Sequence, residues 1–240
     1  MSKSKSKKKW LRKLIIWLPL SFCIITISQV LILKWLDPFT TSFMMTRQAS
    51  AILHADWSFQ IDYRWRDLND ISKHLPLAAV ASEDQRFPEH HGFDFTSIEK
   101  AYKSNLKGRK VRGGSTISQQ LAKNLFLWSG RSYVRKALEA WYTFWIEMLW
   151  SKKRILEMYV NVVEFGNGVY GAEAASRRFF NMPAKSLSKT QSARLAAVLP
   201  NPKLYNAANP GPYVRRRTST IERQMRALGG SSYLKDCCSK

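Results

Sequence analysis

EDQRFPEHHGFD occupies Glu83 to Asp94, and GGSTISQQLAKN occupies Gly113 to Asn124. The first block crowds acidic, aromatic, histidine and glycine residues together. The second is a cluster of hydroxyl and amide side chains closed by a lysine. Charged and amide residues are mostly exposed in proteins, so packing alone does not explain such a concentration. The two blocks therefore predict a site of polar chemistry.

Four more blocks follow along the chain. They are RKALE from Arg135 to Glu139, KKRILEMYVN from Lys152 to Asn161, FGNGVYGAEAA from Phe165 to Ala175 and LAAVLPNPKLYN from Leu195 to Asn206. In this order, the six blocks resemble the motifs of glycosyltransferase family 51, the peptidoglycan polymerase domain that builds glycan strands from lipid II. Since the chain is short and no transpeptidase domain follows, the resemblance implies a monofunctional member.

A long apolar segment lies near the N-terminus. From Leu14 to Leu33 no residue is charged, and about 20 apolar residues cross a hydrocarbon core of about 30 Å as one helix. Seven lysine and arginine residues precede this segment, which predicts a cytoplasmic N-terminus. A cleaved signal peptide is the alternative, but its apolar region is about 7–15 residues long. Because Lys34 to Pro38 offers no cleavage site, an uncleaved signal anchor is expected.

These features predict four parts of the chain. Residues 1–13 are expected to form a basic cytoplasmic tail, and residues 14–33 a transmembrane signal anchor. Residues 37–74 are expected to form a juxtamembrane segment and part of a small lobe, followed by the catalytic domain at 75–230. The aromatic and basic residues mixed within 37–69 fit either ordinary packing or contact with a polyprenyl tail.

The charge of the chain is strongly positive, with a formal net charge of +22. Beyond Asp37 there are still 31 basic against 16 acidic residues, which suits anionic lipid and a diphosphate-bearing substrate. A nucleic-acid partner is not expected, because the chain is predicted to leave the cytoplasm and has no recognisable nucleic-acid motif. The positions of Cys23, Cys237 and Cys238 predict no structural disulfide.

The remaining pattern is helical. Apolar residues recur at helical spacing over 97–106 and 133–150, and residues 152–162 predict another helix with Ser151 as its N-cap. Ser188 and Gln191 have the capping-box spacing before an apolar run that Pro200 ends. No period-two alternation is sustained, so we expect an all-α domain. The resemblance implies a lysozyme-like, two-lobed form of it, with one N-terminal transmembrane helix.

Glu83 is the strongest catalytic candidate. Joining two sugars requires that the 4-hydroxyl of one lose its proton as it attacks the anomeric carbon of the other, and a nearby carboxylate of suitable pKa can accept that proton. The resemblance assigns this general-base role to Glu83. From composition alone, a surface glutamate after the apolar run Leu75 to Ala81 explains the residue equally well.

Glu139 is the second carboxylate. A helical wheel places it at the margin of the apolar stripe, so it is expected to face a cleft without being buried. The alternative without a catalytic role is a surface ion pair with Arg135, which stabilises a helix by only a few tenths of a kcal/mol. The resemblance places Glu139 across the cleft from Glu83, where it assists departure of the diphosphate through neighbouring cations.

The other candidates are expected to bind substrate. The glycines that open the second block permit close backbone approach, and a helix beginning near Ser115 is expected to offer free N–H groups to an anion. His90 and His91 are expected to orient other groups or to form hydrogen bonds, and not to bind a metal ion, since no third ligand is evident. The substrate-binding set is Asp84, Phe87, His90, Gly114, Ser115, Thr116, Gln119, Gln120, Lys123, Asn124, Arg135, Lys136 and Lys153. Glu157 and Asn161 are expected to brace the cleft, while Gly166, Gly168 and Gly171 indicate a turn and a close helix contact.

Two other functions remain open. Paired carboxylates are also found in glycosidases, but lysines and arginines within the blocks suit a diphosphate leaving group better than a neutral polymer. A non-catalytic cell-wall scaffold is the third possibility, although Glu83 and Glu139 are both present. We expect an inner-membrane enzyme that acts on lipid II and the growing glycan strand and requires no cofactor. Mg²⁺ assistance at the diphosphate and binding to division or elongation proteins are left open.

Overall fold

The computed structural model describes residues 2–96, 99, 114–130 and 132–235. Its helices are α1 (Ser2–Trp35), α2 (Ser42–Leu53), α3 (His74–Glu83), α5 (Ile117–Phe126), α6 (Tyr133–Leu149), α7 (Lys152–Val162), α8 (Ala172–Phe180), α9 (Lys189–Val198) and α10 (Pro212–Ala227). Short 3₁₀ turns are η1 (Leu68–Asp70), η2 (Ala184–Ser186) and η3 (Gly230–Ser232), and the strands are β1 (Asp62–Tyr63), β2 (Glu164–Gly166) and β3 (Val169–Tyr170). The helix predicted at 97–106 lies outside the described residues.

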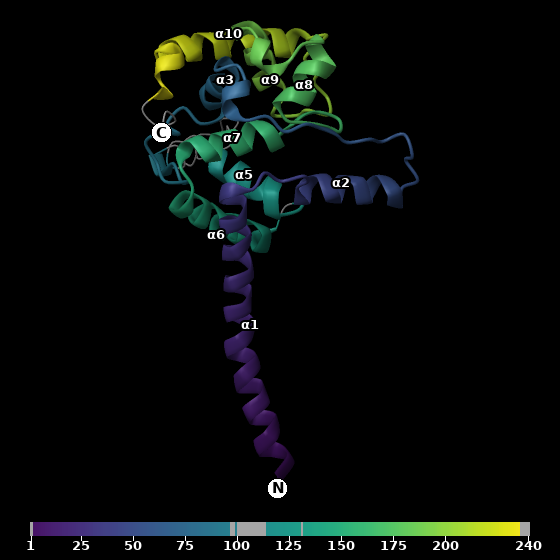
Figure 1. Ribbon diagram of the computed structural model, residues 1–240, viewed down its shortest axis with the longest axis vertical. Coiled ribbons are helices and arrows are strands. Elements are labelled where there is room, and N and C mark those ends of the chain that lie inside the picture. The colour runs from purple at the N-terminus through teal and green to yellow at the C-terminus, as the bar shows by residue number, and fades with distance from the viewer. Residues whose placement is uncertain (1, 97–98, 100–113, 131, 236–240) are drawn as a thin grey trace. The chain divides into compact units, whose positions relative to one another are not determined.

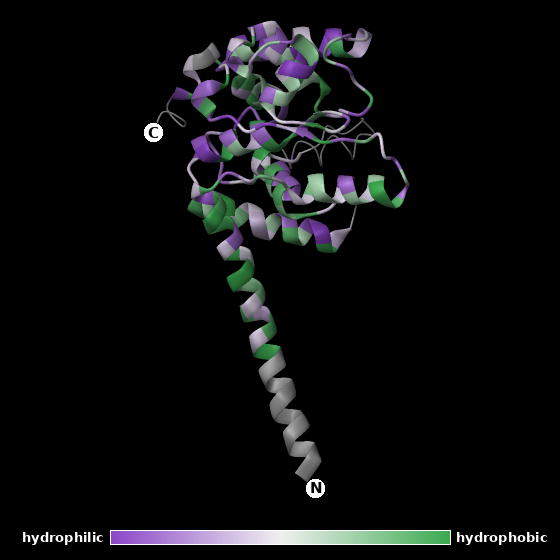
Figure 2. Cartoon of the chain, turned by 45° about the vertical axis from the view of Figure 1, so that its right-hand side comes forward, coloured by the Kyte–Doolittle hydropathy of each residue, from purple (hydrophilic) through white to green (hydrophobic). Residues whose placement is uncertain are grey.

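The chain forms two compact units, Met1–Leu36 and Asp37–Lys240. The first unit consists of α1, in which Ile15–Trp35 is long and apolar enough to cross a membrane, with a mean hydropathy of 2.2. Figure 2 shows hydrophobic residues recurring along this part of the helix. The predicted apolar helix is therefore present, and it extends in both directions beyond residues 14–33.

The second unit contains two groups of packed helices (Figure 1). In one group, α3, α9 and α10 pack against one another. In the other, α5 packs against α2, α6 and α7. The groups are joined where α3 contacts α7. This arrangement confirms the predicted helical fold, and it places Glu83 on a helix of the first group and Glu139 on a helix of the second.

Side-chain caps set where several helices begin. Ser132, Ser151 and Ser188 each accept a hydrogen bond from the backbone N–H three residues ahead, as an N-cap does. The capping box that the sequence predicted at Ser188 is present, with Gln191 as its second member. Because these caps are local signals, the predicted bounds of α7 agree with the structure and those of α6 differ by one residue.

A small sheet was not predicted. β1 pairs in parallel with β3, and β3 pairs antiparallel with β2. Strands of two or three residues are too short to produce a period-two pattern in the sequence. Gly168 forms the turn between β2 and β3 with φ +75°, so the predicted glycine turn is confirmed.

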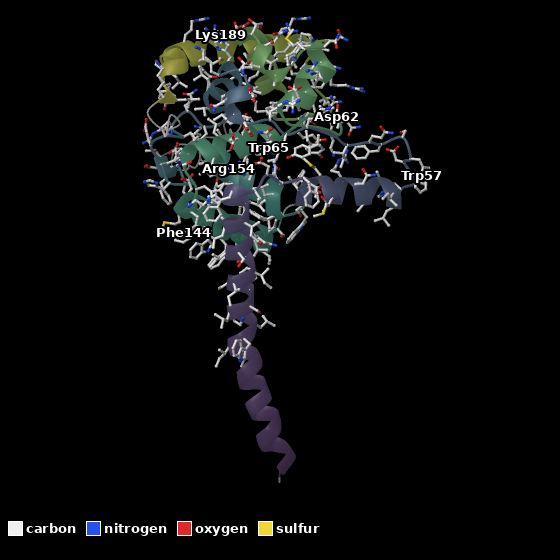
Figure 3. All side chains as sticks on the ribbon, viewed as in Figure 1. Trp57, Asp62, Trp65, Phe144, Arg154 and Lys189 are labelled. Carbon is white, nitrogen blue, oxygen red and sulfur yellow. The ribbon has the colours of Figure 1, made fainter. Side chains whose placement is uncertain are left out.

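The segment before α3 is attached to α7. Asn161 accepts a hydrogen bond from the Arg66 backbone N–H at 3.0 Å and donates one to its carbonyl at 2.8 Å, and Glu157 accepts from the Leu68 N–H at 2.8 Å. These contacts confirm the bracing roles predicted for Glu157 and Asn161. Arg154 adds an ion pair with Asp37 at 2.9 Å and lies over the Trp65 ring, beside which it is seen in Figure 3.

Residues of the 37–69 segment, aromatic ones among them, serve in part for packing. Met44 is buried and Arg47 lies over the Phe59 ring at 4.9 Å, whereas Phe39 and Trp57 are largely exposed. Ordinary packing therefore accounts for some of these side chains and leaves others on the surface.

Candidate active site

Glu83 is the last residue of α3 and is half-buried. Burial raises the pKa of its carboxyl group above the ordinary value, while hydrogen bonding from Gln120 and the positive charge of Arg217 act in the opposite direction. A carboxylate with a raised pKa is a better proton acceptor near neutral pH than an exposed one. The position and environment of Glu83 thus suit a general base.

Gln120 connects Glu83 to the second block. Its Nε2 donates to Glu83 Oε2 at 3.0 Å, and its Oε1 accepts from the Tyr159 hydroxyl at 3.0 Å. Because an ionised carboxylate can only accept, the amide group must present nitrogen to Glu83. The fully buried Tyr159 hydroxyl fixes that orientation, a role that the sequence did not reveal.

The C-terminal segment holds the backbone on both sides of Glu83. Arg217 of α10 donates to the Ser82 carbonyl at 3.0 Å, and the Tyr233 hydroxyl donates to the Gln85 carbonyl at 2.6 Å. Neither residue was singled out from the sequence. The only signal was the position of Arg217 beside the buried apolar positions of α10, such as Val214 and Ile221.

Asp84, the residue after Glu83, pairs with His90. Asp84 Oδ1 is 2.8 Å from His90 Nε2, and Asp84 Oδ2 accepts the Ile117 backbone N–H at 3.0 Å. Both side chains are buried. Since both oxygens of Asp84 have protein partners, Asp84 links the end of α3 to the start of α5 and to His90.

The start of α5 also differs from the expectation. The helix begins at Ile117, and Thr116 and Gln119 form a complete capping box. The Ile117 N–H binds Asp84 and the Gln119 N–H binds Thr116. The helix therefore begins close to the predicted position, but these two N–H groups already have side-chain acceptors and are not free for an anion.

Several predicted substrate-binding side chains are buried. Phe87 has no exposed surface, and Thr116, Gln119 and Asn124 are nearly as inaccessible. Like Asp84 and His90, they pack or hydrogen-bond beneath the site, so direct substrate contact is not supported for them. Gly114 is exposed, and Ser115, Gln120 and Lys123 are partly exposed, so these four remain candidates for contact.

Glu139 is buried, contrary to the expectation of an open cleft position. It is tolerated there because two cations neutralise it: Arg135 Nη1 lies 2.6 Å from Oε2, and Lys136 Nζ lies 2.5 Å from Oε1. Arg135 is largely buried and Lys136 is half-exposed. Glu139 is thus a buried residue with two cationic partners, whereas the alternative considered from the sequence was a surface pair with Arg135 alone.

Both carboxylates influence the pKa of Lys123. Burial is the largest influence and lowers the pKa of its ammonium group, whereas Glu139 raises it. Arg135 and Lys136 lower it and Glu83 raises it more weakly. The charges of α5, α6 and the end of α3 therefore act on one another within a single site.

A second ion pair supports the first block. Lys152 Nζ lies 2.9 Å from Glu147 and donates to the His90 carbonyl at 2.6 Å, while Ser118 Oγ donates to Glu147. Lys153, which was predicted to bind substrate, is half-buried and has no hydrogen bond or ion pair to the described residues. Adjacent lysines on a helix face different directions, and the sequence did not show which one points inward.

Comparison with known proteins identifies the family of the chain. A sequence profile described as transglycosylase matches residues 52–226. The chain belongs to this family. A biosynthetic peptidoglycan transglycosylase of Xanthomonas oryzae pv. oryzae is 57% identical over 216 residues, which cover 90% of this chain and 88% of that protein. One of Xylella fastidiosa is 52% identical over 225 residues, covering 94% and 92%.

The transglycosylase family membership confirms what the six sequence blocks indicated. The profile begins within α2 and ends within α10, so it includes both helix groups, both carboxylates and the cations around Glu139. Arg217 also lies inside the matched range.

Proposed function

We propose that this transglycosylase polymerises lipid II into β-1,4-linked glycan strands and releases polyprenyl diphosphate. The observation that carries the proposal is the arrangement of Lys123, Arg135 and Lys136 around Glu139, within electrostatic range of Glu83. Such a site combines a proton acceptor with cations, which a diphosphate leaving group needs as negative charge develops on it.

These positions support the following reaction. Glu83 accepts the proton of the 4-hydroxyl, whose oxygen attacks the anomeric carbon of the second sugar. The bond from that carbon to the diphosphate oxygen breaks, and its electron pair leaves with the diphosphate. Attack opposite the leaving group inverts the α-linked centre to a β linkage. Lys123 and Lys136 lie where they can stabilise the departing charge, and Glu139 holds Lys136 and Arg135 in place.

We further propose that these residues act without a resident metal ion. In the described part of the chain, no group of three His, Cys, Asp or Glu side chains is placed to hold one. The reaction does not require one in principle, since several protein cations already stand near Glu139. Activity that survives dialysis against EDTA supports this point, and activity restored only by Mg²⁺ contradicts it.

The proposed location is the inner membrane of a Gram-negative bacterium, with the N-terminus in the cytoplasm and the catalytic unit in the periplasm. The apolar segment Ile15–Trp35 and the basic residues before it support this orientation. The substrates are lipid II and the growing strand, and proteins of cell division or elongation are candidate partners.

Two substrates separate polymerase from glycosidase. Purified full-length protein is incubated with labelled lipid II, and products are resolved by length. It is also incubated with peptidoglycan sacculi alone. We expect polymers from lipid II and no soluble fragments from sacculi, with the Glu83→Gln variant inactive in both assays. Muropeptide release above that variant supports the glycosidase, and inactivity in both assays supports the scaffold.

A further inference from the structure

The C-terminal part of the second unit carries an excess of positive charge, most of which lies outside the site described above. Residues 172–235 contain twelve lysine and arginine residues against two glutamates. Figure 2 shows hydrophilic residues recurring along the helices at the top of the view, where Figure 1 places α8, α9 and α10. Charge of this density attracts an anionic ligand unless neighbouring carboxylates balance it.

α10 concentrates this charge on its outer side. Val214, Thr218, Ile221 and Met225 are its buried positions. Arg216 and Arg223 are exposed, and their spacing of seven residues places them above one another on the opposite side. No carboxylate forms an ion pair with either of them in the described range of the chain. Their guanidinium groups are available to a ligand.

The same helix lies beside the proposed base. Arg217, next to Arg216, donates to the Ser82 carbonyl and its charge acts on Glu83. Arg216 and Arg217 line a shallow cleft together with Tyr213 and Thr220. Tyr213 in turn stacks on Tyr205, with ring centroids 4.5 Å apart. Arg217 thus connects the two places, because it lines the cleft and also donates to the backbone next to Glu83.

The chemistry of the residues indicates the ligand. All basic residues of α10 are arginine. The planar guanidinium group binds carboxylate and phosphate through paired hydrogen bonds, which lysine cannot do. In a peptidoglycan precursor, the group that is anionic and distant from the diphosphate is the peptide, which ends in a free carboxylate.

We infer that Arg216 and Arg223 bind the peptide carboxylates of the substrate held at Glu83. The inference rests on the proposed function and specifies which part of the substrate is recognised beyond the reacting atoms. The carboxylate belongs either to incoming lipid II or to the growing strand. In both cases the arginines contribute binding energy that is equal in the ground and transition states, so they affect KM and not kcat.

The test uses the full-length double variant R216Q/R223Q, with lipid II that carries free peptide carboxylates and with lipid II in which these are amidated. We expect KM for the carboxylate form to rise about threefold to tenfold, the effect of two exposed charge pairs. The KM for the amidated form and the kcat for both should be unchanged. Arg178→Gln is the matched control, because Arg178 is an exposed arginine on α8 with no ion pair to the described residues.

A second arm identifies the source of the carboxylate. Extension is started from a preformed strand with free or amidated peptides. If the strand supplies the carboxylate, the double variant loses its defect when the strand alone is amidated. If lipid II supplies it, the defect disappears when lipid II alone is amidated. Persistence of the defect in both cases overturns the inference.

Other results also decide the question. A rise of KM that is the same on both forms of lipid II, or no change of KM at all, contradicts peptide recognition. Weaker binding of the variant to vesicles of anionic lipid, with no dependence on the peptide carboxylates, assigns the arginines to the membrane surface instead. If the wild-type chain polymerises neither form, the proposed function fails before this inference is tested.

Discussion

Gln120 donates a hydrogen bond of 3.0 Å to Glu83 although the two residues are 37 positions apart in the chain. This contact joins the end of α3 to α5. Gln120 is itself oriented by Tyr159 of α7, so three helices determine the geometry of one carboxylate. Asp84 adds a second link from the same turn to the start of α5. The position of the proposed base therefore depends on packing between the two helix groups.

Replacing Glu83 with Gln removes the proton acceptor and nearly preserves its shape. We expect polymerisation to fall by about 10²–10⁴-fold, the usual contribution of a general base. Lipid II binding should change little. The measurement is the initial rate of polymer formation from labelled lipid II. Glu89→Gln is the control, because Glu89 is an exposed carboxylate of the same block. A rate for Glu83→Gln equal to that of the control removes Glu83 from the reaction.

The same variant should be more stable than wild type at neutral pH. Burial raises the pKa of Glu83, so the folded state disfavours the ionised form. A group whose pKa is raised on folding stabilises the fold below its unfolded pKa, and this contribution is lost as pH rises through the folded pKa. The Glu83→Gln variant lacks this loss. Its melting temperature should exceed that of wild type at pH 7.5, and the difference should disappear at pH 4. An advantage that grows in acid contradicts this explanation.

The sequence was informative where its signals were local. Ser151 and Ser188 predicted helix starts because a cap acts within one turn. Glu83 could be selected because its block carries unusual chemistry. What the sequence did not reveal depends on long-range packing. The ion pairs of Glu139 with Arg135 and Lys136 are local, but α6 packs against helices distant in the chain, and the hydrogen bond from Arg217 to the Ser82 carbonyl spans 135 positions.

Gly171 should be intolerant of a side chain. Its φ is +82°, and a Cβ atom would lie 2.3 Å from the backbone oxygen of Asn161. Both the strained φ and the clash with fixed backbone oppose Gly171→Ala. We expect a loss of about 3 kcal/mol, which lowers the melting temperature of a unit of this size by about 6–12 °C.

Gly211→Ala is the control for this variant, since an added Cβ there meets no atom within 4 Å and φ is −68°. Its cost should remain below about 1 kcal/mol, the range for replacing a glycine N-cap by alanine. Equal melting temperatures for the two variants would show that α7 moves away from Gly171 at little cost.

Gln120 should influence the pH dependence of the reaction. Its hydrogen bond stabilises ionised Glu83 and lowers the pKa of that carboxyl group against the larger effect of burial. The Gln120→Leu variant removes this donor, so the pKa of Glu83 should rise further. Since activity requires the ionised base, the acidic limb of kcat/KM should move to higher pH. Tyr159→Phe should give a smaller shift in the same direction. An unchanged acidic limb in both variants separates Gln120 from the titration of Glu83.

The cations around Glu139 should act mainly on the transition state. Lys136 contacts Glu139, and Lys123 is half-buried within range of both carboxylates. Charge on the leaving diphosphate increases as the bond breaks, so the loss of one cation should lower kcat more than it raises KM. Lys136→Met and Lys123→Met keep chain length and remove charge. Each should reduce kcat by about 10²-fold, the effect of losing one stabilising donor.

Lys73→Met, at an exposed position before α3, is the control. If both variants raise KM and leave kcat unchanged, these lysines hold the bound substrate, and the charge on the departing diphosphate must be stabilised by Arg135 or other groups.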